Sequence, residues 1–234
     1  MKTIIIDAGH GGTDPGATAF GIKEKDWNLK MSRYQYKRLN ELGAKVSMTR
    51  TTDSTLESID RANRIKNKFD LCISNHFNAF NGSARGIEAI HSIKNKPRFA
   101  NDLVSALKQE TSLPFRRVFS KKNEQGTDWY FMHRLTGTTE VVIIEYGFLD
   151  NKDDFNYYKN DANFYKAAEA IIKVLCKEVG VMYKMAQNNK VSTPKNKTNN
   201  NLYKVQAGAY SKIENAREQV YKLKKAGFDA FITQ

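Results

Sequence analysis

Two kinds of hydrophobic pattern alternate along the first 180 residues. Short apolar runs, several of them rich in β-branched residues, predict strands at residues 3–8, 44–50, 70–77, 86–92 and 141–148. Apolar positions spaced three or four residues apart predict helices at residues 27–42, 55–68, 98–112 and 161–180. Apolar strands that alternate with helices are usually buried on both faces. We therefore expect an α/β fold with a mostly parallel twisted sheet and helices on both faces.

This pattern ends at Gly180. Residues 186–201 are rich in Asn, Lys, Ser and Thr, with one proline and a single large apolar residue, Val191. A segment of this composition cannot bury a core and is typical of a linker. We therefore expect one domain over residues 1–180, a linker over 181–201 and a small α+β segment over 202–234.

The composition is that of a globular protein, with 40% hydrophobic and 27% charged residues. No apolar run approaches the ~20 residues of a membrane span, so we expect no stable membrane insertion. The first residues lack the pattern of a secretory signal peptide, which predicts synthesis in the cytoplasm without one. Cys72 and Cys176 each lie in an apolar run and are expected to be buried free thiols, with catalytic or zinc-binding cysteine as the alternatives.

The net charge of +13 changes this picture, because it is concentrated at one end of the chain. Residues 181–234 carry ten basic and three acidic residues, more than half of the excess. Such a segment favours a polyanion, which includes nucleic acid, anionic lipid and an anionic cell-wall polymer. The basic residues are scattered along helices without a recognition motif, so we expect no nucleic-acid partner.

Candidate chemistry lies where three predicted strands end. The runs before His10 and His76 and the run that contains Glu145 would converge at one edge of a parallel sheet, where ligands bind in such folds. Glu24, in a predicted loop before the first helix, would fold back over the same edge. Two histidines and a glutamate are the ligand set of a hydrolytic zinc site, and the remaining carboxylate, Glu145, would act as general base and acid.

The glycines around His10 would let the backbone turn sharply and keep the site open to a large substrate. The competing interpretations are a structural histidine and a phosphate-binding glycine loop. The loop lacks the Lys-Ser/Thr pair of a P-loop, and Asp7 and Asp14 would repel a phosphate. His91 and His133 are expected to be structural or, alternatively, to contact substrate.

At this point the residues match a known family. The segments IIIDAGHGGTDPGA, KEKDWNLKMS, the stretch from MTRTTD to SNHFNAF, and VVIIEYGFLDN occur in order within residues 1–178. They resemble the four motifs of the zinc-dependent N-acetylmuramoyl-L-alanine amidases of the Amidase_3 type, found in bacterial autolysins and phage endolysins. The resemblance implies cleavage of the amide between N-acetylmuramic acid and the L-alanine of the peptidoglycan stem peptide.

Carried onto this sequence, the resemblance implies Zn²⁺ held by His10, Glu24 and His76, with Glu145 as the catalytic carboxylate. Gly12, Asn78 and His133 are the expected substrate-binding residues. Phe77 stands where the family often has a small residue between the histidine and the asparagine, which affects the fit of the groove rather than the ligands.

The closing segment, residues 202–234, is similar to the first half of a SPOR domain, a small peptidoglycan-binding fold. A half-unit would leave a strand edge exposed, which a second copy of the chain would cover in a homodimer. The expected function is a phage-type endolysin that reaches the cell wall after release from the cytoplasm, with its basic segment on an anionic wall polymer. The alternatives are a host autolysin of the same activity and a non-catalytic wall-binding protein.

Overall fold

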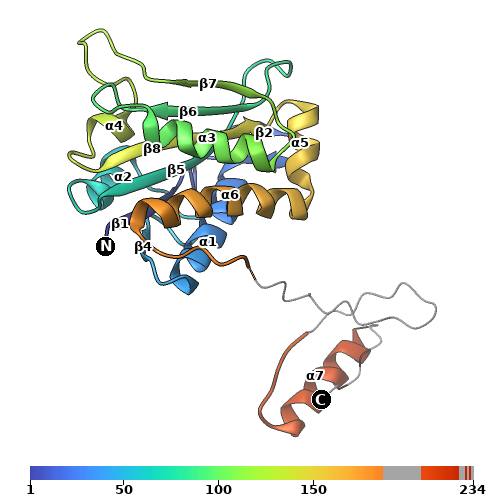
Figure 1. Ribbon diagram of the computed structural model, residues 1–234. Coiled ribbons are helices and arrows are strands. Elements are labelled where there is room, and N and C mark those ends of the chain that lie inside the picture. Colours follow the sequence, from blue (N-terminus) through green and yellow to red (C-terminus); the bar gives the residue numbers. More distant parts are fainter. Residues whose placement is uncertain (187–206, 227–229, 231, 233–234) are drawn as a thin grey trace. The chain divides into compact units, whose positions relative to one another are not determined.

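The computed structural model describes residues 1–186, 207–226, 230 and 232. The chain divides into two compact units, Met1–Ala186 and Gln187–Gln234. Residues 187–201 of the expected linker lie outside the described residues. The first unit is a layered α/β domain that contains every predicted site residue (Figure 1).

A six-stranded sheet forms the middle layer of the first unit, in the order β4-β1-β5-β8-β6-β7 (Figure 1). Its strands are β1 (Thr3–Ala8), β4 (Lys45–Met48), β5 (Leu71–Asn78), β6 (Ile87–His91), β7 (Phe115–Phe119) and β8 (Glu140–Phe148). All neighbouring pairs are parallel except β6 and β8, which are antiparallel. The expected mostly parallel sheet is confirmed. The reversal brings the beginning of β6, rather than its end, to the edge where β5 and β8 end.

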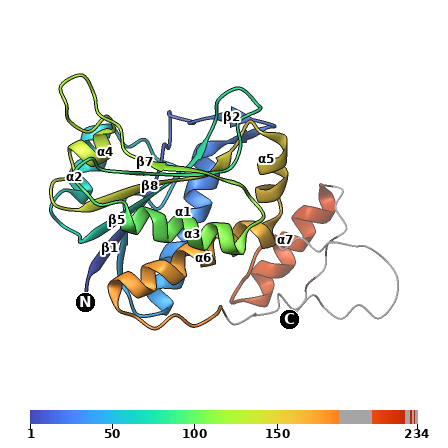
Figure 2. The ribbon, with the colours of Figure 1, turned by 45° about the horizontal axis from the view of Figure 1, so that its top comes forward.

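Helices cover both faces of this sheet (Figures 1 and 2). The larger core is built with α1 (Glu24–Glu41), α3 (Arg98–Glu110), α5 (Lys152–Lys159) and α6 (Asp161–Val179). The smaller core on the opposite face is built with α2 (Ser58–Ile65) and α4 (Phe131–Arg134). Strand β1 shows how one sequence run supplies both cores. Ile4 and Ile6 face the larger core and Ile5 the smaller one, because side chains alternate along a strand.

The first helix begins earlier than the sequence predicts. A short hairpin, β2 (Thr18–Ala19) and β3 (Ile22–Lys23), leads directly into α1. Glu24 is therefore the first residue of a helix, and its predicted place in a loop is wrong. Glu24 and Asp26 put two acidic side chains in the first turn of α1, where the positive end of the helix dipole favours them.

In the second unit the structure describes one helix, α7 (Ile213–Lys225). The SPOR resemblance predicts one strand over residues 205–211 and a second over 227–232. Residues 207–211 are described and form no strand, whereas most of 227–232 lies outside the described residues. Among the described helices of both units, none is long and apolar enough to cross a membrane.

Candidate metal centre

The turn after β1 delivers His10 to the edge of the sheet. His10 has a φ of 57°, a conformation that needs support from its surroundings. Two buried arginines give that support through the backbone carbonyls of the turn. Arg61 donates to the carbonyls of Ala8 and His10, and Arg50 donates to those of Ala8 and Gly9. The position of the histidine is therefore fixed by residues far along the chain.

Three metal-capable side chains meet at this edge: His10 after β1, Glu24 at the start of α1 and His76 near the end of β5. Nε2 of His10 lies 3.1 Å from Oε2 of Glu24, and Nδ1 of His76 lies 2.9 Å from Oε1 of Glu24. One ligand atom from each of the three lies within 4.8 Å of the others. The structure thus brings together the three residues that the sequence named as ligands.

The charges of these groups stabilise one another. Burial raises the pKa of Glu24, but hydrogen bonds and charges from His10 and His76 outweigh it and hold this pKa well below its usual range. Burial lowers the pKa of His10, but Glu24 and Asp14 outweigh it and raise this pKa to about 9. Nδ1 of His10 lies 2.7 Å from Oδ2 of Asp14, which leaves Nε2 facing Glu24. A carboxylate on the far ring nitrogen is the arrangement that orients metal-binding histidines.

Two glycines leave the room that these side chains occupy. A Cβ atom on Gly9 would lie 2.2 Å from Cε1 of His76, and one on Gly16 would lie 2.5 Å from Oε2 of Glu24. Any other residue at either position would displace a ligand. The donor set of two imidazoles and a carboxylate, together with this clearance, fits a zinc site that keeps a coordination position open.

Glu145 lies beside this set on the neighbouring strand. It pairs with His76 in the register of β5 and β8. Its Oε2 atom is buried and has no hydrogen-bond partner among the described residues. Burial raises the pKa of Glu145 well above its usual value, and the negative charges of Glu24 and Glu88 raise it further. A carboxylate in this state is suited to taking up and giving back a proton near neutral pH.

Two of the expected substrate-binding residues, Asn78 and Gly12, already make hydrogen bonds within the chain. Asn78 ends β5, donates to Oε2 of Glu88 and accepts from the amide of Ala79. Gly12 donates its amide to Asp53 and its carbonyl accepts from Lys25, so both of its backbone groups are already paired. Substrate binding by these two residues stays a prediction.

His133 lies in α4 against the smaller core. Its side chain is buried, and its ring nitrogens approach the backbone of Ile90 and Val141 without a hydrogen bond of ordinary geometry. It is not part of the ligand cluster. The ring of Tyr130 lies edge-on against that of His133, and burial and then the charges of Glu145 and Glu88 raise the pKa of Tyr130. Sequence reasoning did not identify Tyr130.

A second residue that sequence reasoning missed is Asp7, in β1. It is fully buried and accepts hydrogen bonds from Arg61, Thr49 and Ser74, each at 2.6 Å. The available signal was an acidic residue inside an apolar strand, because buried carboxylates are rarely found without partners. Through Arg61, Asp7 supports the turn that carries His10.

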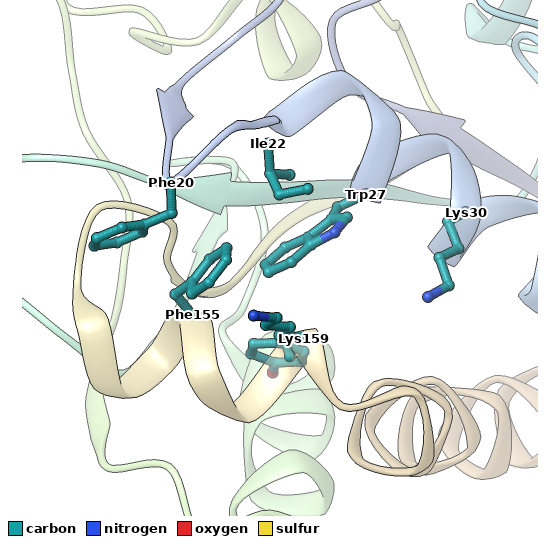
Figure 3. Close-up of a pocket in the computed structure, with 7 residues that line it drawn as sticks. Phe20, Ile22, Trp27, Lys30, Phe155 and Lys159 are labelled. Carbon is teal, nitrogen blue, oxygen red and sulfur yellow. The ribbon is translucent and has the colours of Figure 1, made fainter. Parts of the chain in front are cut away.

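A pocket of ≈ 510 Å³ lies next to the beginning of α1 (Figure 3). Its lining residues come from the β2–β3 hairpin, α1 and α5 and are Phe20, Ile22, Trp27, Lys30, Phe155, Tyr158 and Lys159. The rings of Trp27 and Phe155 stack with their centroids 5.5 Å apart. None of the three metal-capable residues lines this pocket.

The chain is similar in sequence and in fold to known proteins. A model of the N-acetylmuramoyl-L-alanine amidase family, Amidase_3, matches residues 4–177. The chain belongs to this family. A model of the SPOR domain matches residues 183–234 of the chain, so both resemblances found in the sequence are confirmed.

Curated relatives of this chain include a phage endolysin and a probable bacterial cell wall amidase. The endolysin of Bacillus phage SPP1 is 31% identical over 174 residues, which cover 72% of this chain and 62% of the endolysin. The probable cell wall amidase LytH of Staphylococcus aureus is 30% identical over 176 residues, which cover 73% of this chain and 56% of LytH. The matched region thus spans less than two thirds of either relative.

A solved structure shares the fold of this chain. The catalytic domain of CwlV, an N-acetylmuramoyl-L-alanine amidase from Bacillus (Paenibacillus) polymyxa, superposes with a TM-score of 0.70 at 25% identity. The superposition covers 78% of this chain and 100% of that domain.

Proposed function

We propose that this chain is a zinc-dependent N-acetylmuramoyl-L-alanine amidase that cleaves the bond between N-acetylmuramic acid and L-alanine in peptidoglycan. The observation that carries the proposal is the cluster of His10, Glu24 and His76, whose ligand atoms lie within 4.8 Å of one another. Family membership supports the reaction class, and the donor set supports the metal.

Zinc held by these three residues would polarise the substrate carbonyl and lower the pKa of a water molecule. Glu145 would accept a proton from the attacking water and pass it to the nitrogen of the leaving amine. Its raised pKa supports both steps. A carboxyl group with an ordinary pKa would lose the proton to the solvent at neutral pH before it could pass the proton to the leaving amine. Asp14 would keep the ring of His10 in one orientation throughout.

Within this activity we propose the role of a phage-type endolysin. Similarity to the endolysin of phage SPP1 and the SPOR segment support this role. A host autolysin is the second candidate, because the similarity to LytH is nearly the same. We further propose that residues 183–234 bind peptidoglycan, as the SPOR match indicates. Attachment to an anionic wall polymer and self-association of this segment stay predictions.

The test is incubation of the purified, zinc-loaded chain with purified peptidoglycan. We expect new N-terminal L-alanine, loss of this product with a chelator, and recovery when zinc is returned. Glu145→Gln should still bind zinc but lose at least a hundredfold of the turnover, because the proton carrier is removed, roughly the contribution of a general base.

The matched control is Glu140→Gln, on the same strand five positions before Glu145. It should keep ordinary activity. New reducing sugar ends in place of free L-alanine would instead identify a glycosidase. Zinc binding without either product would favour the non-catalytic wall-binding alternative, and full activity of Glu145→Gln would remove Glu145 from the mechanism.

A further inference from the structure

A row of four paired positions crosses the sheet from the metal ligands to its edge strand. The positions are His76 in β5, Glu145 in β8, Glu88 in β6 and Arg117 in β7. Paired residues on neighbouring strands face the same side of a sheet, and neighbouring strands lie about 4.8 Å apart. The row therefore leads from a predicted zinc ligand, past the predicted catalytic carboxylate, to an arginine on the edge strand β7.

Strand β7 has a β-bulge at the end of this row. Ile87 pairs with Phe115, whereas the next residue of β6, Glu88, pairs with Arg117. Arg116 is the extra residue, so that Arg116 and Arg117 together oppose Glu88. Bulges of this kind change the direction of a side chain and are common next to active sites. Here the bulge brings two consecutive arginines to one carboxylate.

The hydrogen bonds confirm this convergence. Nε of Arg116 and Nε of Arg117 both donate to Oε1 of Glu88, at 2.7 and 2.8 Å. Oε2 of Glu88 accepts from Asn78, at 3.0 Å. Glu88 is only 1% exposed, so both guanidinium groups contact its carboxylate on their buried side.

The outer sides of the two guanidinium groups remain available. The side chains of Arg116 and Arg117 are 41% and 53% exposed, and Glu88 is their only acidic partner within the described part of the chain. The ring of Phe148 lies 5.4 Å from the guanidinium of Arg116, and that of Phe119 lies 4.1 Å from the guanidinium of Arg117. One arginine is enough to neutralise Glu88, so the pair carries one positive charge in excess.

We propose that Arg116 and Arg117 form a carboxylate-binding subsite for the peptide part of the substrate, with Glu88 as its positioning residue. Guanidinium groups with free terminal nitrogens bind carboxylates through two parallel hydrogen bonds. This inference rests on the proposed amidase function. It adds a preference for peptides that carry a free acid near the cleaved amide.

The spacing of the row indicates which acid is bound. Arg117 lies two strands beyond Glu145, about 10 Å, and the arginine side chains reach back towards Glu88. An extended peptide advances about 3.5 Å per residue. The subsite therefore fits a carboxylate one or two residues after the L-alanine.

The experiment uses soluble N-acetylmuramoyl peptides in which each carboxylate is converted to a carboxamide in turn. For the unaltered chain we expect kcat/KM to fall about tenfold or more for one such amide, the loss of one charge-assisted hydrogen-bonded contact. Arg117→Gln should lose a similar factor on the acid and show no preference between acid and amide. Arg117→Lys keeps the positive charge but lacks the planar guanidinium group, so its preference for the acid should lie between that of the unaltered chain and that of Arg117→Gln.

Two further variants separate the subsite from folding. Arg98→Gln, which removes an exposed arginine on α3, is the control and should keep the preference. A triple variant with Arg116→Gln, Arg117→Gln and Glu88→Gln leaves no buried carboxylate unpaired and should lose the preference while remaining folded. Equal rates on all peptides by the unaltered chain, or a preference retained in the triple variant, would overturn the subsite.

Binding measurements test the carboxylate-binding subsite independently of turnover. Calorimetric titration of the zinc-loaded Glu145→Gln variant with the free acid and amide peptides should show about tenfold tighter binding of one acid. This difference should disappear in the triple variant. Absence of cleavage of every peptide would count against the amidase function alone, whereas equal binding of acids and amides would count against the subsite alone.

Discussion

At the scale of single residues, burial lowers the pKa of a histidine and neighbouring carboxylates raise it, and a different effect prevails at His10 and at His133. His10 lies between two carboxylates, and its pKa is raised to about 9. His133 lies in the smaller core, and burial lowers its pKa to about 4, with a small opposing effect from Asp128. The protonated, positively charged form is therefore favoured for His10 at the candidate metal centre and disfavoured for His133 in α4.

The environment of His133 predicts a pH dependence of stability. An unfolded chain protonates this histidine below about pH 6.5, whereas the folded chain resists protonation until about pH 4. Its contribution is therefore complete above pH 6.5 and is lost as the pH falls towards 4. Between pH 7 and 5 we expect the free energy of unfolding to fall by roughly 1–2 kcal/mol more in the unaltered chain than in His133→Phe.

Urea unfolding of both proteins at several pH values measures this difference. Met132→Leu, a substitution at a buried residue of α4 that removes no titratable group, serves as the control and should keep the pH profile of the unaltered chain. Parallel pH profiles for the unaltered chain and His133→Phe would show that His133 is protonated as readily in the folded state as in the unfolded one.

At the scale of elements, the end of β1 depends on a buried ion pair. Asp7 and Arg61 lie 2.6 Å apart with side chains that are 0% and 6% exposed, and Arg61 continues to the carbonyl of His10. Burial raises the pKa of Asp7, but Arg61, Ser74 and Thr49 outweigh it and lower this pKa. This ion pair thus joins β1 to α2 just before the turn that carries His10, a predicted zinc ligand.

Asp7→Asn should destabilise the domain by about 3–5 kcal/mol, because it leaves the guanidinium of Arg61 buried without a counter-charge. Asp70→Asn, at an exposed acid that bonds to Thr3, is the control and should cost much less, because water can replace the lost partner. Chemical denaturation measures both. Similar losses in the two variants would mean that Arg61 finds another partner or water.

At the scale of the whole molecule, catalysis and wall binding are assigned to different units. Every member of the predicted metal centre lies within Met1–Ala186, and the SPOR match falls almost entirely in the other unit. Residues 187–234 carry nine basic and three acidic residues, close to half of the net charge of +13. The basic segment is therefore expected to affect where the enzyme acts rather than the chemistry it performs.

Removal of residues 187–234 should leave the rate on a soluble N-acetylmuramoyl peptide within about twofold, since the row from His76 to Arg117 is intact. The shortened chain should sediment less with insoluble peptidoglycan. Repeating the measurement at high salt separates a specific contact from attraction to an anionic polymer, which salt screens. Equal sedimentation of both chains would assign wall binding to the first unit.

The sequence by itself determined five of the six strands of the sheet and the helices α1, α2, α3 and α6, but not β7, α4 or α5. Apolar runs of strand length that end in His10 and His76 are local signals, and parallel strands necessarily bring their ends to one edge. Glu145 lies in a third such run and Glu24 just before the first predicted helix, and the family motifs contain both residues. The strand and helix predictions succeeded because each depends on a short-range pattern, whereas the roles of these four residues stay predictions.

Only the tertiary structure decided the reversed direction of β6, the bulge at Arg116 and the ion pair between Asp7 and Arg61. Each depends on the register between segments that lie tens of residues apart. A shift of one residue in that register would turn every side chain of a strand to the opposite face, and nothing within the strand itself records which register forms. Which side chains stand beside the predicted metal centre, beyond its ligands, is therefore a property of the packed sheet.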